Sequence, residues 1–114
     1  MPNNDSRIET TFSALADPTR RAVVQALSNG PTAVSQLAKP FEMALPSFTQ
    51  HLAVLEDAGL IVSKREGRSR ICSLNPSTLK VAEDWMATYR QQWEHRMDRY
   101  QAHLKNMKSE KPND

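Results

Sequence analysis

The stretch that decides the fold is SFTQHLAVLEDAGL at residues 47–60, together with IVSKREGRSRICSL at residues 61–74. The first segment predicts a helix whose apolar residues recur at steps of four and three and form one core-facing stripe, Phe48, Leu52 and Leu55. Gly59 follows at the position where a left-handed residue ends a helix. The second segment contains two short runs with β-branched residues, joined by a polar link around Gly67, and this pattern predicts a β-hairpin.

Three shorter helices are predicted before these segments. The first carries apolar residues at helical spacing, Ile8, Phe12 and Leu15. The second begins at Asp17 and Pro18, a capping residue followed by a proline at the first helical position, and it ends before the break at residues 29–31. The third is short, is capped by Thr32 and ends before Pro40.

A long last helix is predicted over residues 77–107, after the break that Asn75 and Pro76 form. The element order is therefore helix, helix, helix, turn, helix, hairpin and helix. This order predicts a mainly α fold with a small β-hairpin, the winged helix-turn-helix. In that fold the third and fourth helices form the helix-turn-helix, and the hairpin is the wing.

Length and composition fit one small domain that works in a reducing compartment. The 114 residues predict a single winged-helix domain over residues 1–114, with flexible tails at about 1–6 and 108–114. Cys72 is the one cysteine, which excludes an intramolecular disulfide and favours the cytoplasm. No apolar run approaches the ~20 residues that span a membrane, and the polar start lacks the apolar core of a signal peptide.

The fourth helix presents a small polar face opposite its core stripe. At about 100° per residue, the side chains that point away from the stripe are those of Pro46, Thr49, Gln50 and Ala53, with Ser47 flanking them. Hydroxyl groups can bind bases or phosphates, and a glutamine can pair bidentately with adenine. This face predicts insertion into the DNA major groove. The alternative is a polar face that is only solvated.

The hairpin concentrates positive charge around a tight turn. Its basic residues are Lys64, Arg65, Arg68 and Arg70, and they face a single acid, Glu66. Such a tip can reach phosphates or enter the minor groove, and Arg68 beside Gly67 is the first candidate for a DNA contact. The alternative is a solvated edge whose charges protect the hairpin from aggregation. The residues expected to attach the hairpin to the core are Ile61, Val62, Ile71 and Leu74.

Three motifs carry a family resemblance: ADPTRR at residues 16–21, SFTQHLAVLEDAGL at 47–60 and REGRSR at 65–70. With them the sequence resembles the ArsR family of winged-helix repressors over about residues 8–105. The resemblance implies a homodimer that binds operator DNA and leaves it on an inducing signal. It also implies that DNA is contacted by Ser47, Thr49, Gln50 and His51, with Arg68 and Arg70 on the wing.

Some motif residues also have a structural interpretation. By helical phase, His51 lies at the edge of the core stripe, so its ring can bond a nearby backbone group instead of DNA. Arg20 and Arg21 can pair with acids such as Glu56 or Asp57 rather than with phosphates.

The sequence departs from the metal-sensing members of that family. The third helix holds no cysteine, and Cys72 stands alone on a predicted strand, where a small buried core residue is expected. A thiolate site for zinc or arsenic needs two or more cysteines. The last helix carries His95 and Asp98 but lacks the Asp-x-His pair of the family's site. We therefore expect no metal and no cofactor, with a redox signal at Cys72 as an alternative.

The last helix carries an apolar seam that exceeds what one small domain can cover. The seam includes Trp85, Tyr89, Trp93, Met97 and Tyr100, and aromatic residues are enriched at protein interfaces. We expect a homodimer formed by this helix and by the first helix with its Ile8, Phe12 and Leu15. A two-fold dimer presents two fourth helices to successive major grooves, which predicts a partly palindromic operator.

No motif in the sequence predicts catalysis. The chain has three glycines and no glycine-rich phosphate loop, and no nucleophile elbow is present. The expected function is that of a sequence-specific DNA-binding transcriptional regulator, a homodimeric repressor. The rival interpretation is a winged-helix module that binds another protein. The sequence identifies neither the operator nor the inducing signal, for which a small organic molecule is one candidate.

Overall fold

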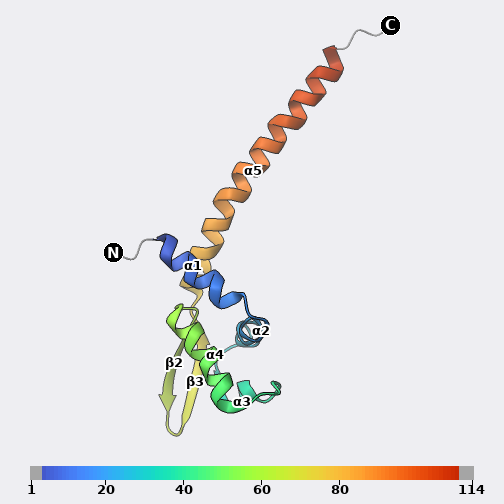
Figure 1. Cartoon of the computed structure of the whole chain (residues 1–114). Helices are drawn as coiled ribbons and strands as arrows, with labels where there is room; N and C mark the ends of the chain where they lie inside the picture. The colour runs from blue at the N-terminus through green and yellow to red at the C-terminus, as the bar shows by residue number, and fades with distance from the viewer. Residues whose placement is uncertain (1–3, 111–114) are drawn as a thin grey trace. The chain divides into compact units, whose positions relative to one another are not determined.

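The helices and the hairpin follow the predicted order in the computed structural model, which describes residues 4–110 and the side chains of residues 6–108. The elements are α1 (Asn4–Leu15), α2 (Pro18–Leu27), β1 (Thr32–Ala33), α3 (Val34–Ala38), α4 (Leu45–Asp57), β2 (Ile61–Glu66), β3 (Ser69–Leu74) and α5 (Pro76–Glu110). Figure 1 shows β2 and β3 as a hairpin next to α4. The mainly helical winged helix-turn-helix prediction is therefore confirmed.

The chain divides into two compact units, one that ends at Ala82 and one that begins at Glu83. The first unit holds α1 to β3 and the first turns of α5, and the second holds the rest of that helix. The helices are longer than expected, because residues 4–6 and 108–110 of the predicted tails are helical. The other tail residues lie outside the described part, and the single domain stays a prediction.

The wing belongs to a sheet of three antiparallel strands in the order β1-β3-β2. The short strand β1 was not expected, since Thr32 was predicted to cap the third helix. That prediction is wrong: Thr32 pairs with Cys72 across the sheet, and its hydroxyl donates to the Gly30 carbonyl at 3.0 Å. Helix α3 instead begins after Ala33, without a side-chain cap.

The core of the first unit lies between the helices and the sheet. The predicted stripe of Phe48, Leu52 and Leu55 is fully buried, as are Leu60 and Ile61 after the turn. Val62 was expected in the core but is 53% exposed, because neighbouring residues of a strand point to opposite faces. The inward position of the partner strand is taken by Cys72, whose burial confirms the prediction of a small core residue.

Two turns fix the direction of the elements around α4. Asp17 accepts a hydrogen bond from the Arg20 backbone N–H at 3.1 Å, which confirms the predicted start of α2. Gly59 has φ +74°, the left-handed conformation expected after α4. A Cβ there would also lie 3.2 Å from Oγ1 of Thr78, so the turn from α4 into β2 is tight. Strand β2 therefore runs back beside α4.

None of the helices within residues 4–110 combines the length and the apolar character that a membrane crossing requires.

Candidate nucleic-acid interface

The face of α4 opposite its core stripe is open to solvent. Ser47, Gln50 and Ala53 are exposed, and Thr49 is half-buried with its hydroxyl donating to the Pro46 carbonyl at 3.0 Å. The first turn of α4 contains no acid, so nothing there repels a phosphate. The surface has the small polar side chains that a helix in a major groove needs. At the start of the helix, Leu45 is 55% exposed, which the helical spacing of the apolar residues did not predict.

His51 is turned towards α2 instead of the open face. Its Nδ1 lies 3.2 Å from Nη1 of Arg20 and 3.8 Å from Oδ2 of Asp17. Because a guanidinium only donates, Nδ1 is the acceptor in the contact with Arg20, and neutral His51 carries its proton on Nε2. The ring is half-buried. The partner is a side chain, whereas the sequence suggested a backbone group, and the DNA contact of His51 stays a prediction.

The carboxylate of Asp17, which caps α2, supports the contact between Arg20 and His51. The backbone N–H of Arg20 that bonds the Asp17 carboxylate is the main cause that holds the pKa of Asp17 below its ordinary value. The positive charge of the His51 ring, when that ring is protonated, and the charge of Arg20 also lower this pKa, while desolvation opposes them. An ionised Asp17 therefore lies beside the histidine ring at the start of α2.

Arg20 and Arg21 bind the carboxyl end of α1. Nε of Arg20 donates to the Ala14 carbonyl at 2.6 Å, and Nη1 of Arg21 donates to the Leu15 carbonyl at 2.9 Å. The expected pairing with Glu56 or Asp57 is therefore wrong. The two arginines bond α1 because α2 starts directly after it, and the last carbonyls of α1 lack partners within the helix.

The wing cations differ in their partners. Lys64 forms an exposed ion pair with Glu66 at 3.7 Å, whereas Nη2 of Arg70 lies 2.6 Å from Oε1 of Glu56 on α4. For Arg65 and Arg68, the described part of the chain offers no ion pair, and both side chains are exposed. The wing therefore presents two exposed cations without an ion pair among the described residues, and the hairpin that carries them lies next to α4 (Figure 1).

Cys72 lies under the base of the wing with no exposed surface. Burial, and next the charge of Glu56, raise the pKa of its thiol, and Arg70 opposes them only in part. The thiol is therefore protonated at neutral pH and shielded from oxidants, which disfavours a redox signal at this residue. Within the described residues, no three histidine, cysteine, aspartate or glutamate side chains gather where a metal ion could bind.

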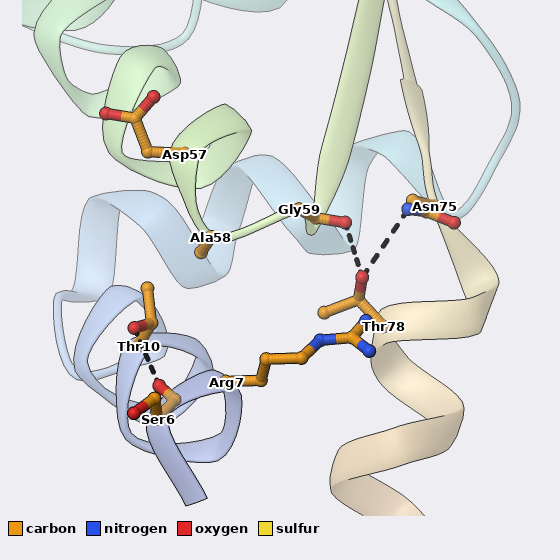
Figure 2. Close-up of a pocket in the computed structure, with 8 residues that line it drawn as sticks. All are labelled: Ser6, Arg7, Thr10, Asp57, Ala58, Gly59, Asn75 and Thr78. Atoms are coloured by element: carbon orange, nitrogen blue, oxygen red, sulfur yellow. Dashed lines mark hydrogen bonds between the residues drawn. The ribbon is translucent and has the colours of Figure 1, made fainter. Parts of the chain in front are cut away.

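The first unit also contains a polar pocket of about 330 Å³. It lies where α1, the turn after α4 and the start of α5 meet (Figure 2), and its charged lining residues are Arg7 and Asp57. Thr78 closes one side: its hydroxyl donates to the Gly59 carbonyl at 2.6 Å and lies 3.4 Å from Nδ2 of Asn75. Sequence periodicity gave no signal for this pocket, because its residues come from three separate segments.

The fold, the open polar helix and the basic wing define a winged helix-turn-helix protein. A helix-turn-helix domain family matches residues 15–64. The HTH-type transcriptional regulator Rv2034 of Mycobacterium tuberculosis is 41% identical over 71 residues, which cover 62% of this chain and 66% of that protein. The transcriptional repressor SdpR of Bacillus subtilis is 32% identical over 82 residues, which cover 72% of this chain and 91% of the repressor.

Among solved structures, the crystal structure of the ArsR family transcriptional regulator RHA00566 is similar over 82% of this chain and 97% of that chain. The TM-score is 0.76 and the sequences are 47% identical. The protein belongs to the ArsR family of transcriptional regulators.

Proposed function

We propose that the protein binds operator DNA with α4 in the major groove and the wing on the flanking backbone. The observation that carries this proposal is the open face of α4 with Ser47 and Gln50, next to the cations Arg65 and Arg68. A base-reading helix beside a phosphate-binding wing supplies both the sequence preference and the electrostatic attraction that specific binding needs. Such a regulator acts on the chromosome, so we place it in the cytoplasm, and we assign it no catalytic activity.

The protein acts as a homodimer in this proposal. The apolar side chains of the second unit are open to solvent, and Trp93 is 62% exposed. The others with substantial exposure are Trp85, Met86, Tyr89, Tyr100, Leu104 and Met107. Aromatic residues bury large areas in protein interfaces, and a second copy would cover this stripe. In α1, Ile8 is buried within the single chain and Leu15 packs on the core, so we propose a smaller part in the interface for α1 than for the second unit.

A two-fold dimer holds two α4 helices for half-sites about 34–36 Å apart. We therefore propose a partly palindromic operator at which the bound dimer blocks transcription. The named repressor SdpR, which the chain matches over most of its length, supports repression as the outcome.

The releasing signal in this proposal is a small polar molecule. The pocket beside Arg7 and Asp57 can admit such a ligand, whereas Cys72 is buried and therefore poorly placed to sense an oxidant. A thermal-shift screen of small polar metabolites tests the site. If a compound binds in the pocket, the rise in melting temperature that it causes should disappear in Arg7→Ala and remain in Lys105→Ala. A rise that remains in Arg7→Ala would place the ligand elsewhere.

Electrophoretic mobility shift with the DNA upstream of the protein's own gene tests the function. A scrambled DNA of equal length is the control, and the assay is repeated with zinc and with a chelator. Specific binding in both conditions supports a metal-independent DNA regulator. Binding that zinc abolishes contradicts the expectation of no metal site. No specific binding by the folded protein favours the rival module that binds another protein.

A further inference from the structure

Three side chains join the wing to the last turn of α4, and we call them the wing latch: Glu56, Ser63 and Arg70. Oε1 of Glu56 accepts two hydrogen bonds of 2.6 Å, one from the Ser63 hydroxyl on β2 and one from Nη2 of Arg70 on β3. Nε of Arg70 also donates to the Ser63 hydroxyl at 2.9 Å. Each strand of the wing is thereby bonded to the helix that faces DNA.

The latch also balances charge within the hairpin. Arg70 lies directly opposite Arg65 in the β2–β3 register. Like charges at such positions destabilise a sheet, so the Arg70 charge needs a nearby anion. Glu56 supplies it with a side chain that is 28% exposed, and hydrogen bonds between ionised groups are shorter and stronger than neutral ones. Arg65 is not bonded within the latch, so its charge is available to another anion.

Arg70 is consequently poorly suited to bind a phosphate. Its Nε and Nη2 are bonded to Ser63 and Glu56, so a phosphate would have to bind at Nη1, beside the Glu56 carboxylate that repels it. Arg65 and Arg68 have no such cost, because the described residues give neither an ion pair. The arginines of the wing therefore divide into one that holds the wing and two that are available for DNA.

We propose that Arg70 is a positioning residue that acts through Glu56 and Ser63 to set the wing against α4, while Arg65 and Arg68 contact DNA. This inference rests on the proposed DNA-binding function. It has an unexpected consequence for Glu56: an acid close to DNA strengthens binding, although simple electrostatics would have it weaken binding.

The test is fluorescence anisotropy with the operator over a range of salt concentrations. The variants are Glu56→Gln, Arg70→Gln, the double variant, and Ser63→Ala, which removes the bridging hydroxyl without changing charge. We expect each single variant to bind roughly 2- to 30-fold more weakly, the range that packed side-chain networks transmit. The double variant should be no weaker than Arg70→Gln alone, because both changes break one latch.

The salt dependence separates positioning from contact. In a plot of log affinity against log salt concentration, Arg68→Ala should lose about 1.8 of slope, because the dimer loses one phosphate contact from each of its two wings at about 0.9 each, and Arg70→Gln should keep the wild-type slope. Tighter binding by Glu56→Gln, additive effects, unchanged affinity in Ser63→Ala, or a slope loss of about 1.8 in Arg70→Gln would overturn the inference. If the wild-type protein binds no operator, the proposed function itself fails, whereas wild-type binding with any of those results refutes only the latch.

Discussion

Nη1 of Arg20 lies 3.2 Å from Nδ1 of His51, and this contact joins the first turn of α2 to the middle of α4. The same arginine donates to the carbonyls of Ala14 and Ser13 at the end of α1. Three helices therefore meet at one side chain. We interpret His51 as a residue that holds α4 in place, while the neighbouring Gln50 faces outward.

His51→Ala should lower the free energy of unfolding by about 1–2 kcal/mol, because it removes the acceptor that Arg20 bonds. Urea denaturation measures this change. Gln50→Ala is the matched control, and as an exposed substitution it should change stability by less than about 0.5 kcal/mol. A His51→Ala protein with full stability but no operator binding would show that the ring contacts DNA.

Gln50→Ala should relax base preference at one position of each operator half-site. A bidentate contact is worth about 1–3 kcal/mol of discrimination, and its loss should leave the other positions unchanged. Competition binding with operators substituted at single positions measures the effect. Gln25→Ala, which removes an exposed glutamine from α2, is the control. An equal loss of affinity for every sequence would mean that Gln50 does not read a base.

Arg68→Ala should weaken binding to specific and unrelated DNA alike. Arg68 is exposed next to Gly67 at the tip of the wing, and the dimer would lose one phosphate contact at each of its two wings, which lowers the salt slope by about 1.8. Affinity measured at several salt concentrations gives this slope. Lys105→Ala removes an exposed cation from α5 and should leave the slope unchanged. Equal slopes for Arg68→Ala and the wild type would remove the wing tip from the interface.

Trp93→Ala and Met97→Glu should weaken the dimer and DNA binding together. Trp93 is widely exposed in the single chain, and truncation of an aromatic residue central to an interface costs about 2 kcal/mol or more. Sedimentation equilibrium measures the dissociation of the dimer. Gln91→Ala, on the opposite side of the helix, is the control. Intact dimers in both variants would place the interface elsewhere.

Asp17→Asn should make the free energy of unfolding depend less on pH in the acid range. The pKa of Asp17 is lower in the folded protein than its ordinary value of 3.8, so ionisation of this carboxylate favours folding. This contribution is present above pH 3.8 and is lost as the pH falls through the lowered pKa. Urea denaturation should therefore show an advantage of wild type over Asp17→Asn at neutral pH that disappears in strong acid. If the wild type remained more stable than Asp17→Asn in strong acid, ionisation of Asp17 would not be the cause of the difference.

Features that depend on local sequence could be predicted. The stripe of Phe48, Leu52 and Leu55 follows helical spacing, and the Asp17 cap and the left-handed Gly59 are set by a few adjacent residues. The motifs at residues 16–21, 47–60 and 65–70 predicted the family, and the relatives confirm it.

Features that depend on tertiary contacts could not be predicted in the same way. Strand β1 has two residues, too few for an alternating pattern, and its pairing with β3 needs the folded sheet. Glu56 and Arg70 are 14 positions apart, and only the return of β2 along α4 brings them together. The sequence therefore could not show that Arg70, which the resemblance assigns to DNA, is bonded to α4.

Hydroxyl-radical footprinting on the DNA upstream of the gene shows whether a dimer binds two half-sites with α4. We expect two protected patches on one face of the duplex, with their centres about 10–10.5 base pairs or a multiple apart and related by a two-fold axis. Gln50→Ala should weaken both patches equally. A single protected patch, or no protection by the folded protein, would contradict binding of a dimer to two half-sites.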